Sequence, residues 1–326
     1  MSGATGTVLL ARLLRWETML AVVFICEFVL FASISPYFLD VYTLSDATFN
    51  FTERAIVALP LALLIIAGEI DISVAAIIAL SSVTMGLVAS TGSGTGAVVA
   101  AGLGTGLLAG MVNGVLVTLG RVPSIVATIG TMTLFRGAAY AVLGDRVLKD
   151  YPPAFAAFGQ GYLAGPLSNE LALFLLFALL FGVFLHYTRW GRVIFAVGAN
   201  PMASRFAGLA VNRYRFALFA TTGFFSGLAA VLLTSRLGST RPSIAQGWEL
   251  EIISMVILGG VSVWGGKGSI LGVVLAALVF GLITFGLGLM NVPGIVMSIF
   301  VGMLLILVVA VPALVERLRP GRVKGA

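Results

Sequence analysis

Long apolar stretches alternate with short polar, proline-containing or glycine-rich breaks along nearly the whole chain. A helix needs roughly 20 mostly apolar residues to cross a bilayer, and ten stretches approach that length. They cover 17–35, 55–67, 71–90, 96–119, 124–144, 171–187, 214–235, 250–263, 269–289 and 294–312. The second and eighth are short and meet their successors at glycine-rich joints. The pattern therefore predicts an all-α polytopic membrane protein with about ten transmembrane helices, some short or broken, in a single domain over residues 1–326.

The composition agrees with this prediction. Hydrophobic residues make up 60% of the chain and charged residues 10%, whereas soluble domains are about 25% charged. The first apolar run follows Arg12 and Arg15 and is too long for a cleavable signal peptide, so we expect it to remain as the first span, in contact with membrane lipid. The single cysteine, Cys26, excludes an intrachain disulfide.

The distribution of charge predicts an orientation. Basic residues concentrate in cytoplasmic loops of membrane proteins, and a layout with both termini in the cytoplasm places most Lys and Arg there. The net charge of +6 then reflects orientation and not a nucleic-acid partner. The basic residues predicted on the inner side are Arg12, Arg15, Arg121, Arg189, Arg192, Arg205, Arg213, Arg215, Lys267, Arg317, Arg319, Arg322 and Lys324. The acids predicted on the outer side include Asp40, Asp46, Glu53, Asp145, Asp150, Glu170, Glu249 and Glu251.

One inner segment, residues 188–216, combines several arginines and no acid with apolar residues at helical spacing. Asn200 or Ser204 suits a helix cap, and Pro201 suits a first helical position. The helix would then have an apolar face, with Arg205 on its flank; the face would consist of Ala203, Phe206, Ala207, Leu209 and Ala210. Such a helix lies in the lipid interface or docks into a groove of a partner protein. The compact GANP beginning and the GLAVN end favour docking.

The chain has little that could carry catalysis. The GGKGS sequence at 265–269 lacks the glycine spacing and the hydroxyl of a phosphate-binding loop, so we expect no nucleotide site in this chain. His186 is the only histidine, and with one cysteine it makes no credible zinc site or Cys–His pair. We predict no metal, no cofactor bound by this chain and no catalytic residues, which excludes most enzyme classes.

The stretch AGEIDIS, residues 67–73, places Glu69 and Asp71 in an otherwise apolar run. A carboxylate in the bilayer costs a few to more than ten kcal/mol unless it pairs or meets water. The pair could lie at a break near the inner surface, face a water-filled pathway, or cap the next helix through Asp71 or Ser73.

A second polar exception is Asn113. It stands beside glycines that repeat every four residues along the fourth span, at 102, 106, 110 and 114. This spacing predicts close packing against another helix. We predict Asp71, Glu69, Asn113 and Glu249 as polar groups of a substrate pathway.

Four motifs in order carry a resemblance to a known family: GEIDIS at 68–73, GRVPSIVATIGTMTLFRG at 120–137, the arginine-rich segment, and GWELEIISMVILGGVSVWGGKGSILG at 247–272. From about residue 36 to 312 the chain resembles the ribose-type permeases of bacterial ABC sugar importers, in the branch with ribose, rhamnose and furanone autoinducer permeases. The resemblance implies import of a pentose, a deoxyhexose such as rhamnose, or a related furanone, across the inner membrane.

The resemblance also implies partners. These are a second permease subunit, identical or paralogous, ABC ATPase subunits that hold ATP and Mg, and a periplasmic sugar-binding protein. The loop at about 188–214 would contact the ATPase through Gly198, Asn200, Arg205, Gly208 and Asn212. On the outer side, Arg241 and Glu251 are candidates for contact with the binding protein.

One position departs from the family pattern. The chain has Glu69 where the family usually has a small residue, which suggests a heteromeric permease. An alternative of another class is a proton-coupled secondary sugar transporter that uses Glu69 or Asp71.

Overall fold

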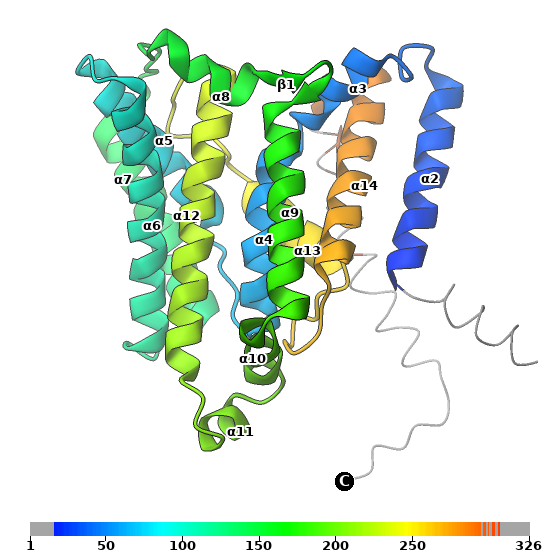
Figure 1. Cartoon of the computed structure of the whole chain (residues 1–326). Helices are drawn as coiled ribbons and strands as arrows, with labels where there is room; N and C mark the ends of the chain where they lie inside the picture. The colour runs from blue at the N-terminus through cyan, green and yellow to red at the C-terminus, as the bar shows by residue number, and fades with distance from the viewer. Residues whose placement is uncertain (1–15, 295, 298, 300–301, 304–305, 307–326) are drawn as a thin grey trace, which may run out of the picture.

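The structure, a computed structural model, describes residues 16–294, 296–297, 299, 302–303 and 306. Long helices stand side by side in a bundle (Figure 1), which confirms the all-α polytopic prediction. The helices are α2 (Trp16–Ile34), α3 (Val41–Thr48), α4 (Thr52–Ile66), α5 (Val74–Ser90), α6 (Thr95–Thr118), α7 (Ser124–Leu143), η1 (Pro153–Ala156), α8 (Ala157–Gln160), α9 (Asn169–Tyr187), α10 (Arg189–Ala199), α11 (Pro201–Phe206), α12 (Val211–Leu237), α13 (Trp248–Leu258) and α14 (Ile270–Leu289). A two-stranded antiparallel hairpin joins β1 (Tyr162–Ala164) and β2 (Leu167–Ser168).

Six described helices are long and apolar enough to cross a membrane, namely α2, α6, α7, α9, α12 and α14. A seventh crossing is formed if α3 and α4, which meet at a bend of 47°, count as one broken span. The remaining apolar helices are shorter: α5 has 17 residues and α13 has 11. The short second and eighth elements are confirmed as α4, with 15 residues, and α13. However, α13 ends at Leu258, five positions before the predicted end, and the chain turns at Gly259 and Gly260. The predicted span 294–312 falls largely outside the described residues.

The two ends of the bundle differ (Figure 1). One end, which we call the hairpin end, carries α3, η1, α8 and the β-hairpin. The other, the α11 end, carries the short helices α10 and α11. The described basic residues that were predicted to share one side belong to segments that meet at the α11 end, as the charge pattern indicated. They are Arg121, Arg189, Arg192, Arg205, Arg213, Arg215 and Lys267.

At the hairpin end, Asp40 begins α3 by accepting a hydrogen bond from the backbone N–H of Thr43 at 2.8 Å. This bond stabilises the carboxylate and lowers the pKa of Asp40 below its usual value. Ser168 begins α9 in the same way by accepting from the N–H of Leu171. These caps fix where the helices start below the surface segments.

The long helices α6 and α12 pack backbone against backbone. A Cβ atom built on Gly106 would lie 2.4 Å from the carbonyl oxygen of Gly223, and one built on Gly110 would lie 2.4 Å from that of Phe219. The reverse also holds, because a Cβ atom on Gly223 would lie 2.3 Å from the carbonyl oxygen of Gly106. The two backbones touch, which confirms the close packing predicted from the glycine repeat.

We expect Gly106→Ala to lower the melting temperature of the purified protein in detergent, because the new methyl group meets backbone that cannot move aside. Gly104→Ala is the matched control, since nothing lies within 4 Å of a Cβ atom there. That control should be neutral or slightly stabilising, because alanine favours a helix over glycine by up to about 1 kcal/mol. Equal melting temperatures for the two variants would contradict the contact between α6 and α12.

Candidate functional site

The chain unwinds over residues 67–73, between α4 and α5, and we call this segment the α4–α5 joint. Gly68 has a φ of +82°, a backbone conformation that glycine adopts without strain. Asp71 Oδ1 accepts hydrogen bonds from the backbone N–H of Ser73 at 2.8 Å and from the Ser73 hydroxyl at 2.7 Å. The sequence allowed Asp71 or Ser73 to cap α5; in the structure Ser73 is the N-cap residue and makes no side-chain capping hydrogen bond, while Asp71 holds the turn directly before it.

The joint is also tied to α6. Asn113 Nδ2 donates to Asp71 Oδ2 at 3.1 Å and to Ser73 Oγ at 2.8 Å. All three side chains are fully buried. Two of the predicted pathway residues thus lie together, as members of an internal network that holds α5 against α6.

Glu69, at the other end of the joint, is only 7% exposed. Its Oε1 lies 2.7 Å from Arg215 Nη1 near the start of α12. The buried Glu69 carboxylate is therefore matched by a positive charge. The proton-coupled alternative relies on the carboxylate of Glu69 or Asp71, and in the structure both side chains have partners within the chain.

A polar pocket of about 550 Å³ lies beside this ion pair at the α11 end. Its charged lining consists of Glu69, Arg121, Arg205 and Arg215, so positive charge exceeds negative charge. Asn212 also lines the pocket; it donates to the carbonyl of Thr118 at 3.1 Å and accepts from Arg205 at 3.3 Å. Such a surface attracts anions and acidic side chains.

The predicted ATPase-contact residues differ in how accessible they are to a partner. Asn200 caps α11 by accepting hydrogen bonds from the backbone N–H groups of Met202 and Ala203, as the sequence suggested. Arg205, Gly208 and Asn212 are exposed, whereas Gly198 is buried. For Gly198 to contact a partner directly, the residues that bury it would have to move away.

Gly198 is where α10 rests on the end of α4. A Cβ atom there would lie 1.7 Å from the carbonyl oxygen of Ile66. The same carbonyl accepts a hydrogen bond from the backbone N–H of Gly266 at 2.8 Å. Three segments far apart in sequence thus meet at one point: α10, the end of α4, and the loop before α14.

The helix α11 exposes two large apolar side chains, Met202 at 68% and Phe206 at 84%. They are four residues apart and therefore share one face of the helix. Figure 1 places α11 beyond the ends of the long helices. The apolar residues predicted to form the docking face included Phe206 but missed Met202, which follows Pro201 directly.

The two candidates for contact with a binding protein differ in whether their side chains already have partners within the chain. Arg241 is exposed. Glu251 is half-buried and forms an ion pair with Arg54, whose guanidinium lies 4.6 Å from the centre of the Trp248 ring. Glu251 is thus engaged within the chain. Glu249 faces a separate pocket with Arg136 and Tyr140.

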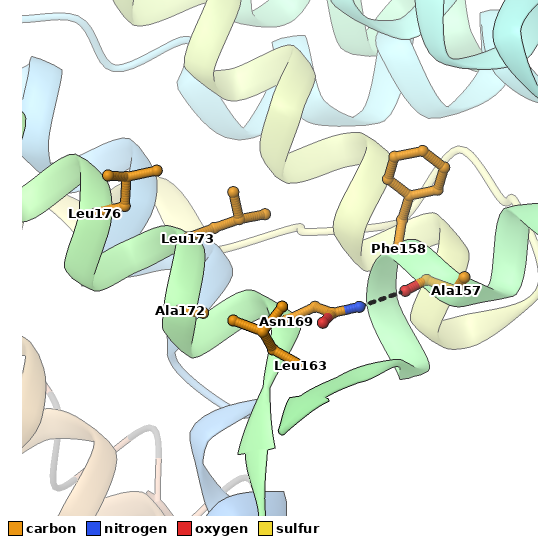
Figure 2. A pocket seen from close by; sticks show the side chains of 7 residues that line it. All are labelled: Ala157, Phe158, Leu163, Asn169, Ala172, Leu173 and Leu176. Carbon is orange, nitrogen blue, oxygen red and sulfur yellow. Dashed lines mark hydrogen bonds between the residues drawn. The ribbon is translucent and has the colours of Figure 1, made fainter. Parts of the chain in front are cut away.

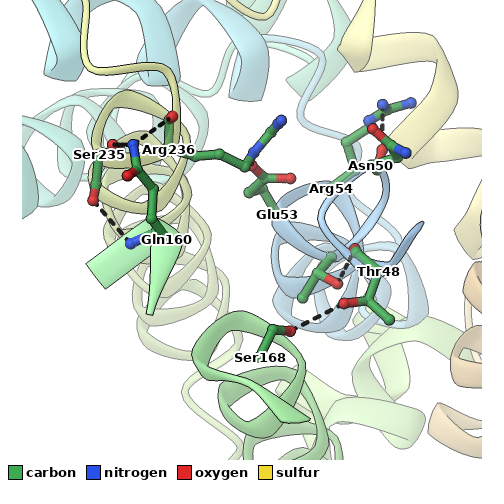
Figure 3. Close-up of polar contacts among 10 residues, drawn as sticks. Thr48, Asn50, Glu53, Arg54, Gln160, Ser168, Ser235 and Arg236 are labelled. Carbon is green, nitrogen blue, oxygen red and sulfur yellow. Dashed lines mark hydrogen bonds and ion pairs between the residues drawn. The ribbon is translucent and has the colours of Figure 1, made fainter. Parts of the chain in front are cut away.

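Sequence reasoning missed a buried charge cluster at the hairpin end (Figure 3). Arg236 Nε lies 2.7 Å from Glu53 Oε1, and Glu53 is fully buried. Glu170, also fully buried, has no hydrogen-bond partner on either carboxylate oxygen within the described residues. Both acids were placed on the outer side as loop charges, but they lie inside the bundle at that end. The available signal was that Glu53, Glu170 and Arg236 lie within two residues of an end of a long apolar stretch.

A larger pocket, of about 610 Å³, lies beside α8, β1 and α9 (Figure 2). Its lining is apolar except for Asn169, whose amide nitrogen donates to the carbonyl of Ala157 at 2.9 Å. With a single polar side chain in its lining, this pocket offers little for recognising a polar ligand. Among the residues that the structure describes, no cluster of three His, Cys, Asp or Glu side chains could hold a metal ion.

Comparisons with known proteins give a consistent result. Residues 43–309 match the family described as "Branched-chain amino acid transport system / permease component". The autoinducer 2 import system permease protein LsrD of Enterobacter sp. (strain 638) is 35% identical over 302 residues, 91% of this chain and 92% of that protein. The protein of the same name from Escherichia coli (strain K12) is 37% identical over 300 residues, 90% of this chain and 91% of that protein. No solved structure matches the chain.

We expect Arg215→Ala to destabilise the protein by about 3 kcal/mol, because it leaves the Glu69 carboxylate buried and unpaired. Removing both charges, in Glu69→Gly with Arg215→Ala, should recover part of the loss. Thermal unfolding of the single and double variants in detergent measures the coupling. Arg213→Ala, which removes an exposed arginine two residues away, is the control and should change little. Additive losses in the double variant would show that the ion pair contributes nothing.

In the turn before α5, Asp71→Asn should cost about 1 kcal/mol or less, because an amide oxygen still accepts from the Ser73 N–H and the unpartnered Asn113 Oδ1 can accept from the new amide. Asp71→Ala should cost about 2 kcal/mol or more, because the hydrogen bonds to Ser73 and the link to α6 are both lost. Hydrogen exchange over residues 72–78 reads this out directly. Similar exchange in the two variants would argue against a role for Asp71 in ordering the start of α5.

Proposed function

Because the chain belongs to the permease family of branched-chain amino acid-type transport systems, we propose that it is the membrane-spanning permease subunit of an ATP-driven importer for a small sugar-like solute. Its partners in this proposal are ATP-binding subunits, a second permease subunit and an external binding protein. The α11 end faces the cytoplasm of a bacterial inner membrane, in keeping with its excess of arginine. ATP and Mg stay on the ATP-binding subunits.

The observation that carries this proposal is the exposed tip of α11. Met202 and Phe206 present an apolar face outside the bundle, and Arg205 stands between them in sequence. Exposed aromatic and apolar side chains beside a cation are typical of protein contacts that bind strongly. The basic pocket next to them suits an acidic side chain of a partner.

A movement of α11 would reach the core through contacts already described. Gly198 joins α10 to the end of α4, and Arg215 joins α12 to Glu69 in the α4–α5 joint. Asp71 then joins this segment to α6 through Asn113. Closure of the ATP-binding subunits would thus shift α4, α6 and α12 together, which is the route to alternating access in this proposal.

The substrate class in this proposal comes from the relatives, whose names describe import of autoinducer 2. A pentose, a deoxyhexose such as rhamnose, or a furanone related to autoinducer 2 would suit a pathway with few charges. Selectivity would lie mainly in the external binding protein. The departure at Glu69 is compatible with a paralogous second permease, since the paired Arg215 makes this joint a distinct, self-contained unit.

The test is co-purification with the ATP-binding subunit of the same transport system. We expect Phe206→Ser to weaken the complex by about tenfold or more, in line with loss of a central aromatic contact. Arg205→Glu should weaken it and reduce its dependence on salt. Tyr187→Ser is the control, because Tyr187 is as exposed as Phe206 but ends α9. Full retention of the complex, with nucleotide-dependent uptake, in the α11 variants would refute the docking role.

A further inference from the structure

A third pocket, of about 340 Å³, lies between α7 and the start of α13. Its polar lining comes from Thr133, Arg136 and Tyr140 on α7 and from Gln246 and Glu249 beside and within the first turn of α13. Unlike the larger apolar pocket at the hairpin end, it gathers a cation, an anion, an amide and two hydroxyl groups around one space. We call it the α7–α13 pocket.

Arg136 is held rigidly in the α7–α13 pocket. Its Nη1 donates to the backbone carbonyls of Pro242 at 2.8 Å and Ile244 at 2.7 Å, and its Nη2 donates to that of Ala75 at 3.2 Å. A guanidinium has five N–H groups, so some remain for a ligand. The cation is thereby positioned before any ligand arrives, which lowers the entropic cost of binding.

Other polar groups in the pocket are free. Within the described part of the chain, the Glu249 carboxylate, the Gln246 amide and the Tyr140 hydroxyl make no hydrogen bond or ion pair. Glu249 is near enough to act electrostatically on Arg136. The pocket therefore holds one charge of each sign and offers both donors and acceptors.

The depth of the pocket limits what it can face. Arg136 lies roughly 18 Å along α7 from Ser124, at 1.5 Å per residue, in a helix long and apolar enough to cross the membrane. Charged side chains at such a depth face water or protein and not lipid tails. The neighbouring Leu134, which is 62% exposed, is the type of residue that faces lipid.

We propose that the α7–α13 pocket is a water-accessible binding site for a neutral, polyhydroxylated ligand of monosaccharide size on the translocation pathway. This inference rests on the proposed transport function and assigns its substrate contact. Glu249 accepts hydrogen bonds from ligand hydroxyls, while Arg136 and Gln246 donate to ligand oxygens. The Tyr140 ring covers the apolar face of the ligand. The opposite charges balance, which suits an uncharged ligand.

Water access is tested with cysteine labelling. In a Cys26→Ser background of the assembled transporter, Thr133→Cys should react with a negatively charged methanethiosulfonate reagent, and the reaction should abolish uptake. Leu134→Cys is the matched control and should stay unreactive, because a thiol in lipid does not ionise. D-ribose and L-rhamnose are the probes for protection, and the one that the wild type imports should slow the labelling of Thr133→Cys. Equal reactivity at the two positions, or no protection by the imported sugar, would overturn the proposal.

The chemistry is tested by Glu249→Gln. We expect the variant to take up the imported sugar about tenfold more slowly than the wild type at a saturating sugar concentration. A decrease of this size corresponds to the loss of one charge-assisted hydrogen bond. Hydrolysis of ATP by the partner, stimulated by the loaded binding protein, should stay within about twofold, since the residues at the α11 end are intact. Asp145→Asn, which removes an exposed loop carboxylate, should leave both rates unchanged. Unchanged uptake in Glu249→Gln would contradict the assignment.

These outcomes separate the inference from the proposed function. If wild-type uptake needs no nucleotide, or neither sugar is imported, the importer proposal falls, while the contrast between Thr133→Cys and Leu134→Cys still decides whether the pocket holds water. If uptake is driven by ATP but Glu249→Gln is unimpaired and Thr133→Cys is unreactive, the importer stands and the α7–α13 pocket is not its substrate site.

Discussion

The structure depends on satisfying an unwound segment of backbone inside an apolar bundle. Between α4 and α5 the chain leaves the helix for seven residues, and in lipid such a break is tolerated only where protein or water supplies hydrogen bonds. Asp71 supplies them to the start of α5, Gly266 supplies one to the end of α4, and Asn113 joins the segment to α6. The break becomes a junction at which α4, α5, α6 and α10 are held together.

The glycine contact between α6 and α12 makes this junction possible. Because Gly106 and Gly223 let the two backbones touch, Asn113 on the same face of α6 is carried into the interior, where its amide reaches Asp71. On α12, Arg215 is carried to Glu69. Backbone contact and polar network are thus two results of one helix pairing, and a charge that would be costly in lipid has its partner within the chain.

The polar surfaces that remain available lie elsewhere. At the α11 end, exposed apolar residues stand beside a basic pocket, which suits a protein partner. Between α7 and α13, Arg136 and Glu249 face a small space within the depth of the bundle, which suits a small polar solute. A permease needs both surfaces, one to receive a mechanical input and one to contact what it moves. The α4–α5 joint, residues 67–73, is the packed region through which α10 and α11 are joined to the long helices.

The sequence alone determined the all-α membrane class, the shared end of the arginines and the glycine packing, and it limited the cap of α11 to Asn200 or Ser204. Hydropathy, charge bias and local capping all act over short distances along the chain, which is why they can be read from it. It could not tell whether Asp71 caps a helix or lines a pathway, since both place a carboxylate at a helix joint. Only the tertiary structure paired Glu69 with Arg215, 146 positions away, engaged Glu251 with Arg54, buried Gly198, and brought Arg136 to Glu249. Those outcomes depend on which helices become neighbours, and the pairing of helices is decided by side-chain packing across the bundle, which no local pattern encodes.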